Sequence, residues 1–199
     1  SDVYKRQKTK NYWILTFQDQ KTNQEWQQKA RYLINAAGPW VGSILKEKLG
    51  QVDMPLIRLV RGSHLVVKKQ YDHEKAYFLQ GRDGRIVFAI PYEQDFTLIG
   101  TTDVEHASTQ FKPVCTDEER DYLLEFVNHY FSKPVTKEDI VWCYSGIRPL
   151  YQDGAAVSTS ATRDYVLKVD KSDAPLLTIY GGKITTHRKL AENVMSEVV

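Results

Sequence analysis

Cysteine is scarce in this 199-residue chain, and long apolar runs are absent. Its two cysteines, Cys115 and Cys143, form neither a CxxC pair nor a Cys/His spacing suited to metal binding. They exclude a disulfide framework and predict reduced thiols. The five histidines show no metal spacing either, so we expect no metal site. No run approaches the roughly 20 apolar residues of a membrane-spanning helix, and no signal peptide opens the chain. These absences predict a cytoplasmic protein.

The chain also lacks an excess of either charge. Its 27 Lys and Arg and 25 Asp and Glu are well mixed and give a net charge of +2. This balance argues against a nucleic-acid partner, because such partners select basic patches. Hydrophobic residues make up 42% of the chain, which is enough for one sizeable core or two small domains.

The first seven residues, SDVYKRQ, differ in character from the rest of the chain. They match the translated end of a sequencing adapter, and a native-like pattern begins only after them. We therefore interpret residues 1–7 as an adapter-derived tail, expected to belong to no native element.

Strand and helix patterns alternate at both ends of the chain. Two β-rich runs, Tyr12–Phe17 and Gln27–Asn35, flank a polar turn and predict a hairpin that feeds a buried strand. Gly38-Pro39 then opens a helix over Trp40–Leu49. Near the other end, a strand over Leu176–Tyr180 runs into a glycine turn and a last helix. Each end therefore contains an α/β unit.

The middle of the chain is rich in strands. Strands are predicted for four segments: LIRLVRGSHLVV, IVFAIPY, FTLIGTT and Ile140–Ile147. A helix is predicted from Thr116 onward, and it begins with a Thr116/Glu119 capping box. We predict an α/β plus α+β fold, in which a smaller mixed-sheet domain is inserted into a larger one.

The glycine turn Gly181-Gly182-Lys183 is the clearest candidate for an anion site. A strand that ends in two glycines and opens a helix leaves backbone N–H groups free, and Lys183 adds a full positive charge. An ordinary β-to-α turn explains the same glycines.

Three further side chains are candidates for binding or catalysis. Arg148, held beside a proline in YSGIRPL, suits bidentate contact with a carboxylate or phosphate, as does Arg163 in TRDYVL. His64, in RGSH, titrates in the range that suits proton transfer. Structural ion pairs for the arginines and a packed imidazole for His64 remain open alternatives.

Taken together, these segments resemble the flavin-linked glycerol-3-phosphate dehydrogenases. Seven motifs occur in the order and approximate spacing of that family: NAAGPW, RGSH, IVFAIPY, IGTTDVE, YSGIRPL, TRDYVL and GGKITTHRKLAE. The resemblance begins near Trp13 and implies an FAD-binding domain of dinucleotide-binding type from residues 8–54 and 150–199. Residues 55–149 would form the substrate-binding cap domain. The chain has no GxGxxG turn, so we expect it to be an internal fragment.

The resemblance also assigns roles to residues. His64 looks like the active-site histidine, and Arg148 like the arginine that reaches the substrate hydroxyl. Arg163 resembles the phosphate-binding arginine. Gly181, Gly182, Lys183, Thr185 and Thr186 would contact FAD, whereas His187 stands where tyrosine is more usual and receives no role. We expect His64, Arg148, Arg163 and Lys183 to line one cleft.

The implied reaction is oxidation of sn-glycerol 3-phosphate to dihydroxyacetone phosphate, with hydride transfer to FAD and electrons passed to a membrane quinone. The enzyme would lie at the inner membrane as a peripheral protein, and a homodimer is compatible with it. Two alternatives stay open: an oxygen-using glycerol-3-phosphate oxidase or other FAD-dependent oxidase of the same fold, and a non-catalytic sugar-phosphate-binding module.

Overall fold

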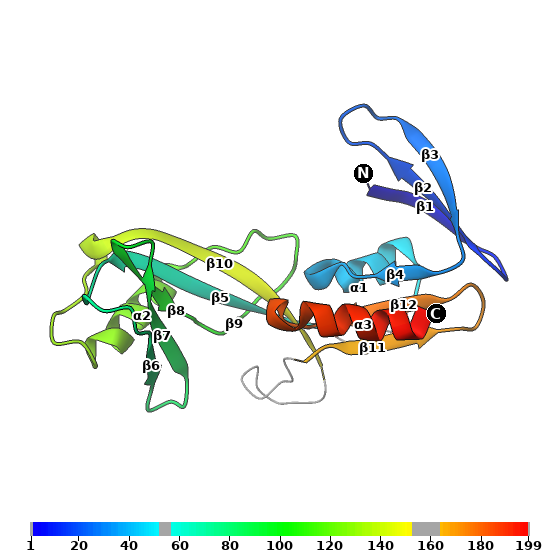
Figure 1. Ribbon diagram of the computed structural model, residues 1–199. Coiled ribbons are helices and arrows are strands. Elements are labelled where there is room, and N and C mark those ends of the chain that lie inside the picture. Colours follow the sequence, from blue (N-terminus) through cyan, green and yellow to red (C-terminus); the bar gives the residue numbers. More distant parts are fainter. Residues whose placement is uncertain (1, 52–56, 153–163, 199) are drawn as a thin grey trace. The chain divides into compact units, whose positions relative to one another are not determined.

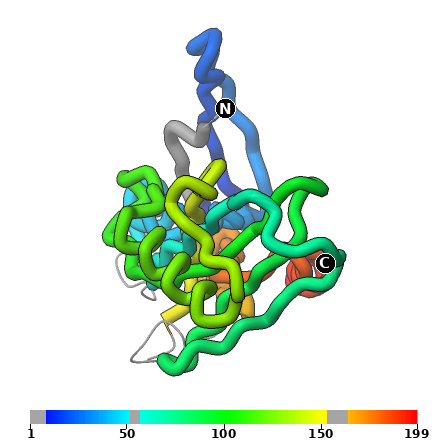
Figure 2. The backbone as a smooth tube through the Cα atoms, turned by 90° about the vertical axis from the view of Figure 1, so that its left-hand side faces the viewer, coloured from blue at the N-terminus to red at the C-terminus, as the bar shows by residue number. Residues whose placement is uncertain are grey.

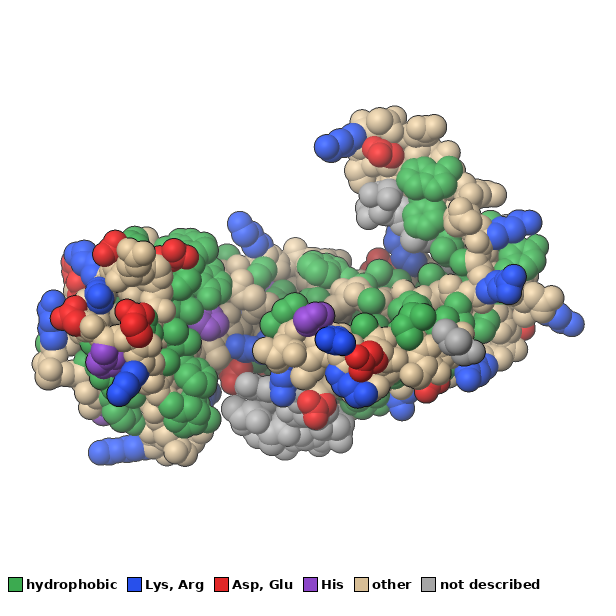
Figure 3. All heavy atoms as spheres, viewed as in Figure 1, with side chains coloured by type: hydrophobic (Ala, Val, Ile, Leu, Met, Phe, Trp, Pro, Cys, Tyr) green, Lys and Arg blue, Asp and Glu red, His purple; other side chains and the backbone are tan. Residues whose placement is uncertain are grey.

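The computed structural model describes residues 2–51, 57–152 and 164–198, and for residues 2–8 it describes the backbone alone. The chain forms two compact units. The first combines Ser1–Arg58 with Pro149–Val199, and the second is Leu59–Arg148. Figure 1 labels the elements of both units. Acidic and basic side chains are interspersed on the face of each unit that Figure 3 shows.

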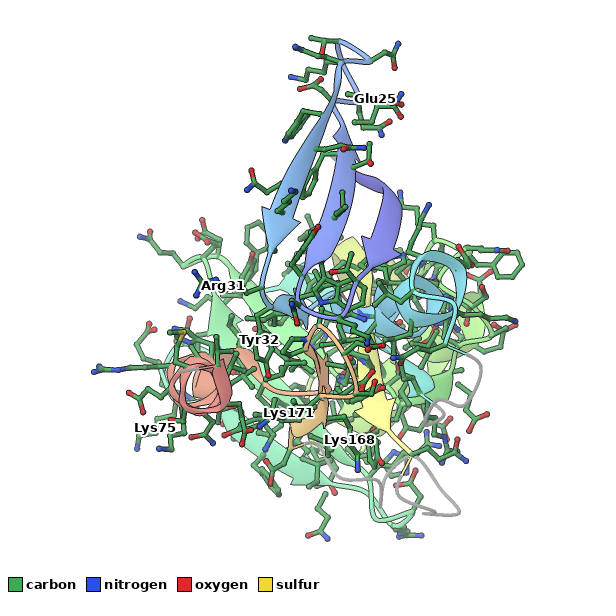
Figure 4. The ribbon with its side chains drawn as sticks, turned by 90° about the vertical axis from the view of Figure 1, so that its right-hand side faces the viewer. Glu25, Arg31, Tyr32, Lys75, Lys168 and Lys171 are labelled. Carbon is green, nitrogen blue, oxygen red and sulfur yellow. The ribbon has the colours of Figure 1, made fainter. Side chains whose placement is uncertain are left out.

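One sheet of the first unit is an antiparallel ribbon. Its order is β1 (Asp2–Lys8), β2 (Trp13–Gln18) and β3 (Glu25–Ala30). The predicted hairpin is confirmed, because β2 pairs with β3 from Trp13↔Ala30 to Gln18↔Glu25. Figure 4 shows Glu25 at the far end of this hairpin, and Arg31 and Tyr32 where the chain leaves β3.

The strand β1 corrects an expectation drawn from the sequence. Residues 1–7 were expected to join no element, yet β1 pairs with β2 along its length, from Asp2↔Gln18 to Lys8↔Trp13. In the sheet order β1-β2-β3, β1 pairs with the edge of β2 that β3 leaves free, so the backbone groups of that edge find partners.

A second sheet of the first unit has the order β11 (Val166–Asp170), β12 (Leu176–Tyr180) and β4 (Leu33–Asn35). The pair of β12 with β4 is parallel, with Leu177 opposite Ile34. Helix α3 (His187–Val198) follows β12, and its Asn193 side chain donates to the Tyr165 hydroxyl at 2.6 Å. The predicted strand over Leu176–Tyr180 and the helix after it are confirmed.

The helix predicted over Trp40–Leu49 is a short segment of mixed type. It consists of η1 (Gly38–Trp40), α1 (Val41–Ser43) and the π-helical η2 (Ile44–Lys48). The last helical residue is Lys48, and Gly50, the predicted end, follows two residues later with a φ of 60° that favours glycine. Buried Val41 and Leu45 anchor it in a core that also contains Trp13 and Leu176.

The second unit is built on one large sheet, and Figure 2 traces the backbone of the chain from a view turned by 90° from that of Figure 1. Its order is β10 (Ile140–Tyr151), β5 (Ile57–Lys68), β8 (Phe96–Gly100), β7 (Ile86–Tyr92) and β6 (Tyr77–Gln80), and β9 (Val104–Glu105) also pairs with β5. The strands predicted from the middle of the chain are confirmed.

Helix α2 (Asp117–Asn128) covers one face of this sheet. It starts with the predicted capping box, in which the Thr116 side chain and the Glu119 side chain each accept from the other residue's backbone N–H. The helix buries Leu123 and Val127 against strand residues such as Leu65 and Ile99. Because side chains alternate along a strand, His64 on β5 points to the opposite face. That face carries the candidate site.

Candidate functional site

His64 is held between a glycine and an aromatic ring. On the sheet it lies opposite Gly100 of β8, and a Cβ atom added at Gly100 would overlap Cδ2 of the imidazole. On β10, the Tyr144 ring stacks on the imidazole with centroids 5.0 Å apart and planes 8° apart. The position of the His64 ring therefore depends on the lack of a side chain at Gly100 as much as on the presence of Tyr144.

This setting favours the neutral imidazole. Burial lowers the pKa of His64 below its ordinary 6.5, and the nearby charge of Arg148 lowers that pKa further. Its Nδ1 atom is buried and has no hydrogen-bond partner within the described part of the chain. A neutral imidazole beside a cation can accept a proton at physiological pH.

Arg148 stands on the same face of the sheet, on β10. Its guanidinium occupies the space that a side chain at Gly62 would fill. Nη1 donates to Oδ1 of Asp103 at 2.8 Å, and Nη2 donates to Oγ1 of Thr101 at 2.8 Å. Nη1 also lies 3.4 Å from the carbonyl oxygen of Thr102. The cation is therefore fixed in place by the segment that follows β8.

The structure thus brings His64 and Arg148 together within the second unit. A fixed cation next to a neutral base can stabilise an alkoxide while the base removes the hydroxyl proton. The ion-pair alternative for Arg148 also holds, since Asp103 is its partner.

Sequence reasoning gave no role in the site to four residues that shape this pair: Gly62, Gly100, Asp103 and Tyr144. A usable signal exists for Gly62 and Tyr144, because their even spacing from His64 and Arg148 along a strand puts them on the same face. Asp103 comes from a segment 45 residues from Arg148, and only the sheet order reveals that contact.

The glycine turn belongs to the first unit. Gly181 and Gly182 adopt φ of 70° and 100°, which side-chain-bearing residues rarely adopt. At Gly181 a Cβ atom would lie only 3.1 Å from the Asp164 carbonyl oxygen. The exposed Lys183 amine lies 3.8 Å from Oδ1 of the exposed Asp164. Such a surface ion pair is weak enough for the amine to exchange partners.

The residues after Lys183 form the turn η4 (Ile184–Thr186). The backbone N–H of Thr186 donates to the Lys183 carbonyl at 3.1 Å, and its hydroxyl reaches the same oxygen at 3.2 Å. The predicted role of the Thr186 N–H in ligand binding would therefore compete with this internal bond. Nδ1 of His187 lies 2.7 Å from the Ile184 carbonyl, which ties that side chain to the turn.

A second feature lies at the same edge of the parallel strand pair. Because β12 and β4 are parallel, their carboxyl ends share one edge of the sheet. After β4, the small residues Ala36 and Ala37 line a cavity of about 480 Å³, together with Trp40 and Ile44. Ligands of open α/β sheets bind at this edge.

The remaining predicted residue, Arg163, lies outside the described residues, and Thr185 is exposed in η4. His64 and Arg148 belong to one unit and Lys183 to the other, so the single cleft that would join them stays a prediction. Within the described residues, no cluster of three or more His, Cys, Asp or Glu could hold a metal ion. No helix of that part is long and apolar enough to cross a membrane.

The chain thus contains a parallel strand pair that leads into a glycine turn in its first unit, and a histidine–arginine pair on the sheet of its second unit. Residues 3–188 match the family described as FAD dependent oxidoreductase. The chain belongs to this family of flavoenzymes.

Within the family, the chain is similar to dehydrogenases of phosphorylated polyols. It is 46% identical over 173 residues to a glycerol-3-phosphate dehydrogenase of Pseudomonas tolaasii, which covers 85% of the chain and 34% of the relative. It is 41% identical to the aerobic glycerol-3-phosphate dehydrogenase of Escherichia coli K12, over 94% of the chain and 38% of the relative. A D-erythritol 1-phosphate dehydrogenase of Brucella abortus is 40% identical, over 92% and 37%.

A solved structure agrees with these sequence relatives. The glycerol-3-phosphate dehydrogenase of Bacillus halodurans, solved in complex with FAD, matches with a TM-score of 0.79 and 32% identity. The match covers 99% of the chain and 38% of that protein. The chain thus spans just over a third of the length of the relatives it matches.

The first unit fits the family's cofactor. FAD carries a pyrophosphate and a flavin ring that becomes anionic on reduction, and both favour positive potential. The exposed Lys183, the glycine turn and the first turn of α3 provide that potential at the carboxyl edge of β12. Among the described residues of this unit, Gly181, Gly182 and Lys183 could hold part of FAD.

Proposed function

We propose that this chain is part of a dehydrogenase that oxidises sn-glycerol 3-phosphate to dihydroxyacetone phosphate. The observation that carries the proposal is the half-buried imidazole of His64 on the same face of the sheet as the guanidinium of Arg148, which Asp103 and Thr101 hold in place. The names of the similar proteins support the substrate class, since two of them are glycerol-3-phosphate dehydrogenases and the third acts on another phosphorylated polyol.

His64 and Arg148 divide the chemistry at the substrate alcohol. His64 accepts the proton of the C2 hydroxyl, for which its lowered pKa keeps it neutral. Arg148 faces the developing alkoxide, and its ion pair with Asp103 holds the guanidinium in one orientation. FAD, when bound, would supply the acceptor for the C2 hydride, and a membrane quinone would be the final acceptor of the electrons.

The substrate phosphate and the cofactor need further cations. We assign the phosphate to Arg163, on the family resemblance of TRDYVL, because a bidentate guanidinium fixes a phosphate and thereby positions the reacting carbon. We assign the pyrimidine edge of the flavin to Lys183, with Gly181, Gly182, Thr185 and Thr186 around it. The enzyme would lie at the cytoplasmic side of the inner membrane as a peripheral protein, with a homodimer compatible with that location.

Steady-state kinetics of the full-length protein that contains this chain test the proposal. Glycerol 3-phosphate, D-erythritol 1-phosphate and unphosphorylated glycerol are compared as substrates, with a quinone analogue or oxygen as the acceptor. We expect glycerol 3-phosphate to give the highest kcat/KM and the quinone analogue the faster turnover. A higher kcat/KM for D-erythritol 1-phosphate would reassign the substrate, and faster turnover with oxygen would favour an oxidase.

Two variants separate binding from chemistry in the same assay. Arg163→Ala should raise the KM for glycerol 3-phosphate, because it removes a contact to the phosphate made in both the ground state and the transition state. His64→Ala should mainly lower kcat. An unchanged kcat in His64→Ala would remove this histidine as the base.

A further inference from the structure

A buried carboxylate lies behind the candidate site, on the face of the sheet that α2 covers. Glu119 is 4% exposed. As the third residue of α2 it closes the capping box by accepting the Thr116 N–H at Oε2, at 3.1 Å. That role occupies one lone pair of a group able to accept several hydrogen bonds. The remaining acceptor sites of Glu119 are directed to the strands beneath the helix.

Three strand-side groups meet this carboxylate. The hydroxyls of Thr102 and Ser63 donate to Oε1 at 2.7 Å and 2.8 Å. The Arg61 guanidinium lies 2.8 Å from Oε2. Burial alone raises the pKa of Glu119, but the bonds from Thr102, Thr116, Ser63 and Arg61 more than offset it, so the pKa lies below its ordinary value. Glu119 is therefore a fully bonded, ionised carboxylate in the interior.

The bonds continue between the two segments that Glu119 joins. The Ser63 backbone N–H donates to the Thr102 hydroxyl oxygen at 2.9 Å, and the Thr102 N–H lies 3.3 Å from the Ser63 carbonyl. The Ser63 hydroxyl donates to Glu119, so it accepts its 2.7 Å bond from Ser145 of β10. The carboxylate thus fixes β5, β10 and the segment after β8 in one arrangement.

Both joined segments carry the groups of the candidate site. Ser63 lies between Gly62 and His64 in the sequence, and the guanidinium of Arg148 lies over Gly62. Thr102 stands between Thr101 and Asp103, and the side chains of both these neighbours bind that guanidinium. Ser63 is therefore next to His64 in the sequence, and Thr102 is next to both residues whose side chains bind Arg148.

From this arrangement we infer that Glu119 is a positioning residue for the oxidation chemistry, acting through Thr102 and Ser63 on the orientation of Arg148 relative to His64. The inference rests on the proposed function. Losing one bond of a buried network leaves its partners unpaired, and they relax by moving. A shift of about 1 Å at a reacting group can lower a rate about a hundredfold.

The test uses the full-length flavoprotein and two ways of cutting the network. Thr102→Val keeps the shape of the side chain and removes the hydroxyl that binds Glu119, whereas Thr102→Ser restores the hydroxyl. Glu119→Gln removes the charge, and Glu118→Gln, at the exposed neighbouring position of the same helical turn, is its matched control. Steady-state kinetics with glycerol 3-phosphate are combined with hydrogen exchange of the peptide that contains residues 101–103.

We expect Thr102→Val and Glu119→Gln to lower kcat by about tenfold to a hundredfold with little change in KM, since the phosphate contact is untouched. Exchange at residues 101–103 should increase in both. Thr102→Ser and Glu118→Gln should match the wild type in both measurements. If Glu119→Gln fails to fold, Thr102→Val against Thr102→Ser decides the question.

Two results would overturn the inference. One is a kcat within twofold of wild type in Thr102→Val; the other is loss of kcat in Thr102→Ser equal to that in Thr102→Val. If the wild-type protein does not oxidise glycerol 3-phosphate, that result would instead contradict the proposed function. Hydrogen exchange would then decide the network alone, and unchanged protection of residues 101–103 in Thr102→Val would contradict it.

Discussion

Two glycines, Gly62 and Gly100, shape the candidate site by leaving room for larger side chains. The guanidinium of Arg148 fills the space beside Gly62, and the imidazole of His64 fills the space beside Gly100. Neither glycine has a positive φ. Their requirement is therefore one of space, which distinguishes them from Gly181 and Gly182, where the backbone conformation itself needs glycine.

The variant Gly62→Ala separates activity from stability. The three atoms nearest to the new methyl group all belong to the guanidinium of Arg148, which would have to move and loosen its bonds to Asp103 and Thr101. We expect a loss of at most about 2 kcal/mol in the free energy of unfolding, but a fall in kcat/KM of about tenfold or more. Denaturant unfolding and steady-state kinetics measure the two effects.

The control for this variant is Gly146→Ala, since a Cβ atom at Gly146 meets nothing within 4 Å. Its unfolding free energy should stay close to that of the wild type. Full retention of kcat/KM in Gly62→Ala would show that the position of Arg148 does not matter for the reaction.

The lowered pKa of His64 leads to a prediction about how stability and kcat/KM depend on pH. Because its folded-state pKa lies below the 6.5 of the exposed side chain, the unfolded state binds the proton more tightly. The stability contribution is therefore complete above about pH 6.5 and declines as the pH falls toward the folded-state pKa. The acid limb of kcat/KM should likewise lie below about 6.5.

Replacing Arg148 by Gln should move that limb to higher pH, because the cation that lowers the pKa of His64 is gone. The measurement is the pH profile of kcat/KM in both proteins. An acid limb above 6.5 in the wild type, or one that does not respond to Arg148→Gln, would contradict the assignment of His64 as the base.

Residue types and local motifs were enough to single out His64 and Arg148, but they could not show what holds these side chains. The partners Asp103 and Thr101 lie 45 and 47 positions from Arg148 in the sequence. Their contact follows from the sheet order β10-β5-β8, in which Arg148 of β10 reaches over Gly62 of β5 to the segment that follows β8. Sequence periodicity predicts strands and leaves their order open.

At the scale of elements, the start of α2 is a helix boundary that the sequence predicts correctly. Thr116 and Glu119 form the predicted capping box, and three acidic residues occupy the first turn, where the helix dipole favours them. Removing the cap with Thr116→Ala should destabilise the second unit by about 1 kcal/mol. Thr116→Ser keeps the hydroxyl and should cost much less.

Thermal unfolding of the full-length protein measures this difference between the two Thr116 variants. Equal melting temperatures for Thr116→Ala and Thr116→Ser would show that the cap does not stabilise the helix. Because the capping box shares Glu119 with the buried network, Thr116→Ala should also lower kcat. This fall in kcat should be smaller than the fall in Glu119→Gln.

Two elements departed from their sequence patterns for physical reasons. The helical segment from Gly38 to Lys48 changes from 3-10 to α to π geometry within 11 residues, and its buried Val41 and Leu45 pack in a core with residues distant in the sequence, such as Trp13 and Leu176. The strand β1 forms because β2 offers an unpaired edge. Neither tertiary effect is visible in a local window of sequence.

At the scale of the molecule, the strands β5 and β10 link the two units, since each begins in one and ends in the other. The family resemblance supplied the domain scheme of residues 8–54 and 150–199 around residues 55–149. Charge, periodicity and turn signals alone predicted an inserted domain without its ligand. The proposed ligands come from the chemistry of His64, Arg148 and Lys183 together with the relatives.

The central claim is that this flavoenzyme removes a hydride equivalent from a phosphorylated alcohol with His64 as the base. The most direct measurement is anaerobic mixing of the full-length protein with one equivalent of substrate, followed by the flavin absorbance. We predict that glycerol 3-phosphate bleaches the flavin of the wild type rapidly, that His64→Ala bleaches at least about a hundredfold more slowly, and that glycerol leaves it oxidised. Bleaching by an amino acid but not by glycerol 3-phosphate, or equal rates in wild type and His64→Ala, would contradict the account.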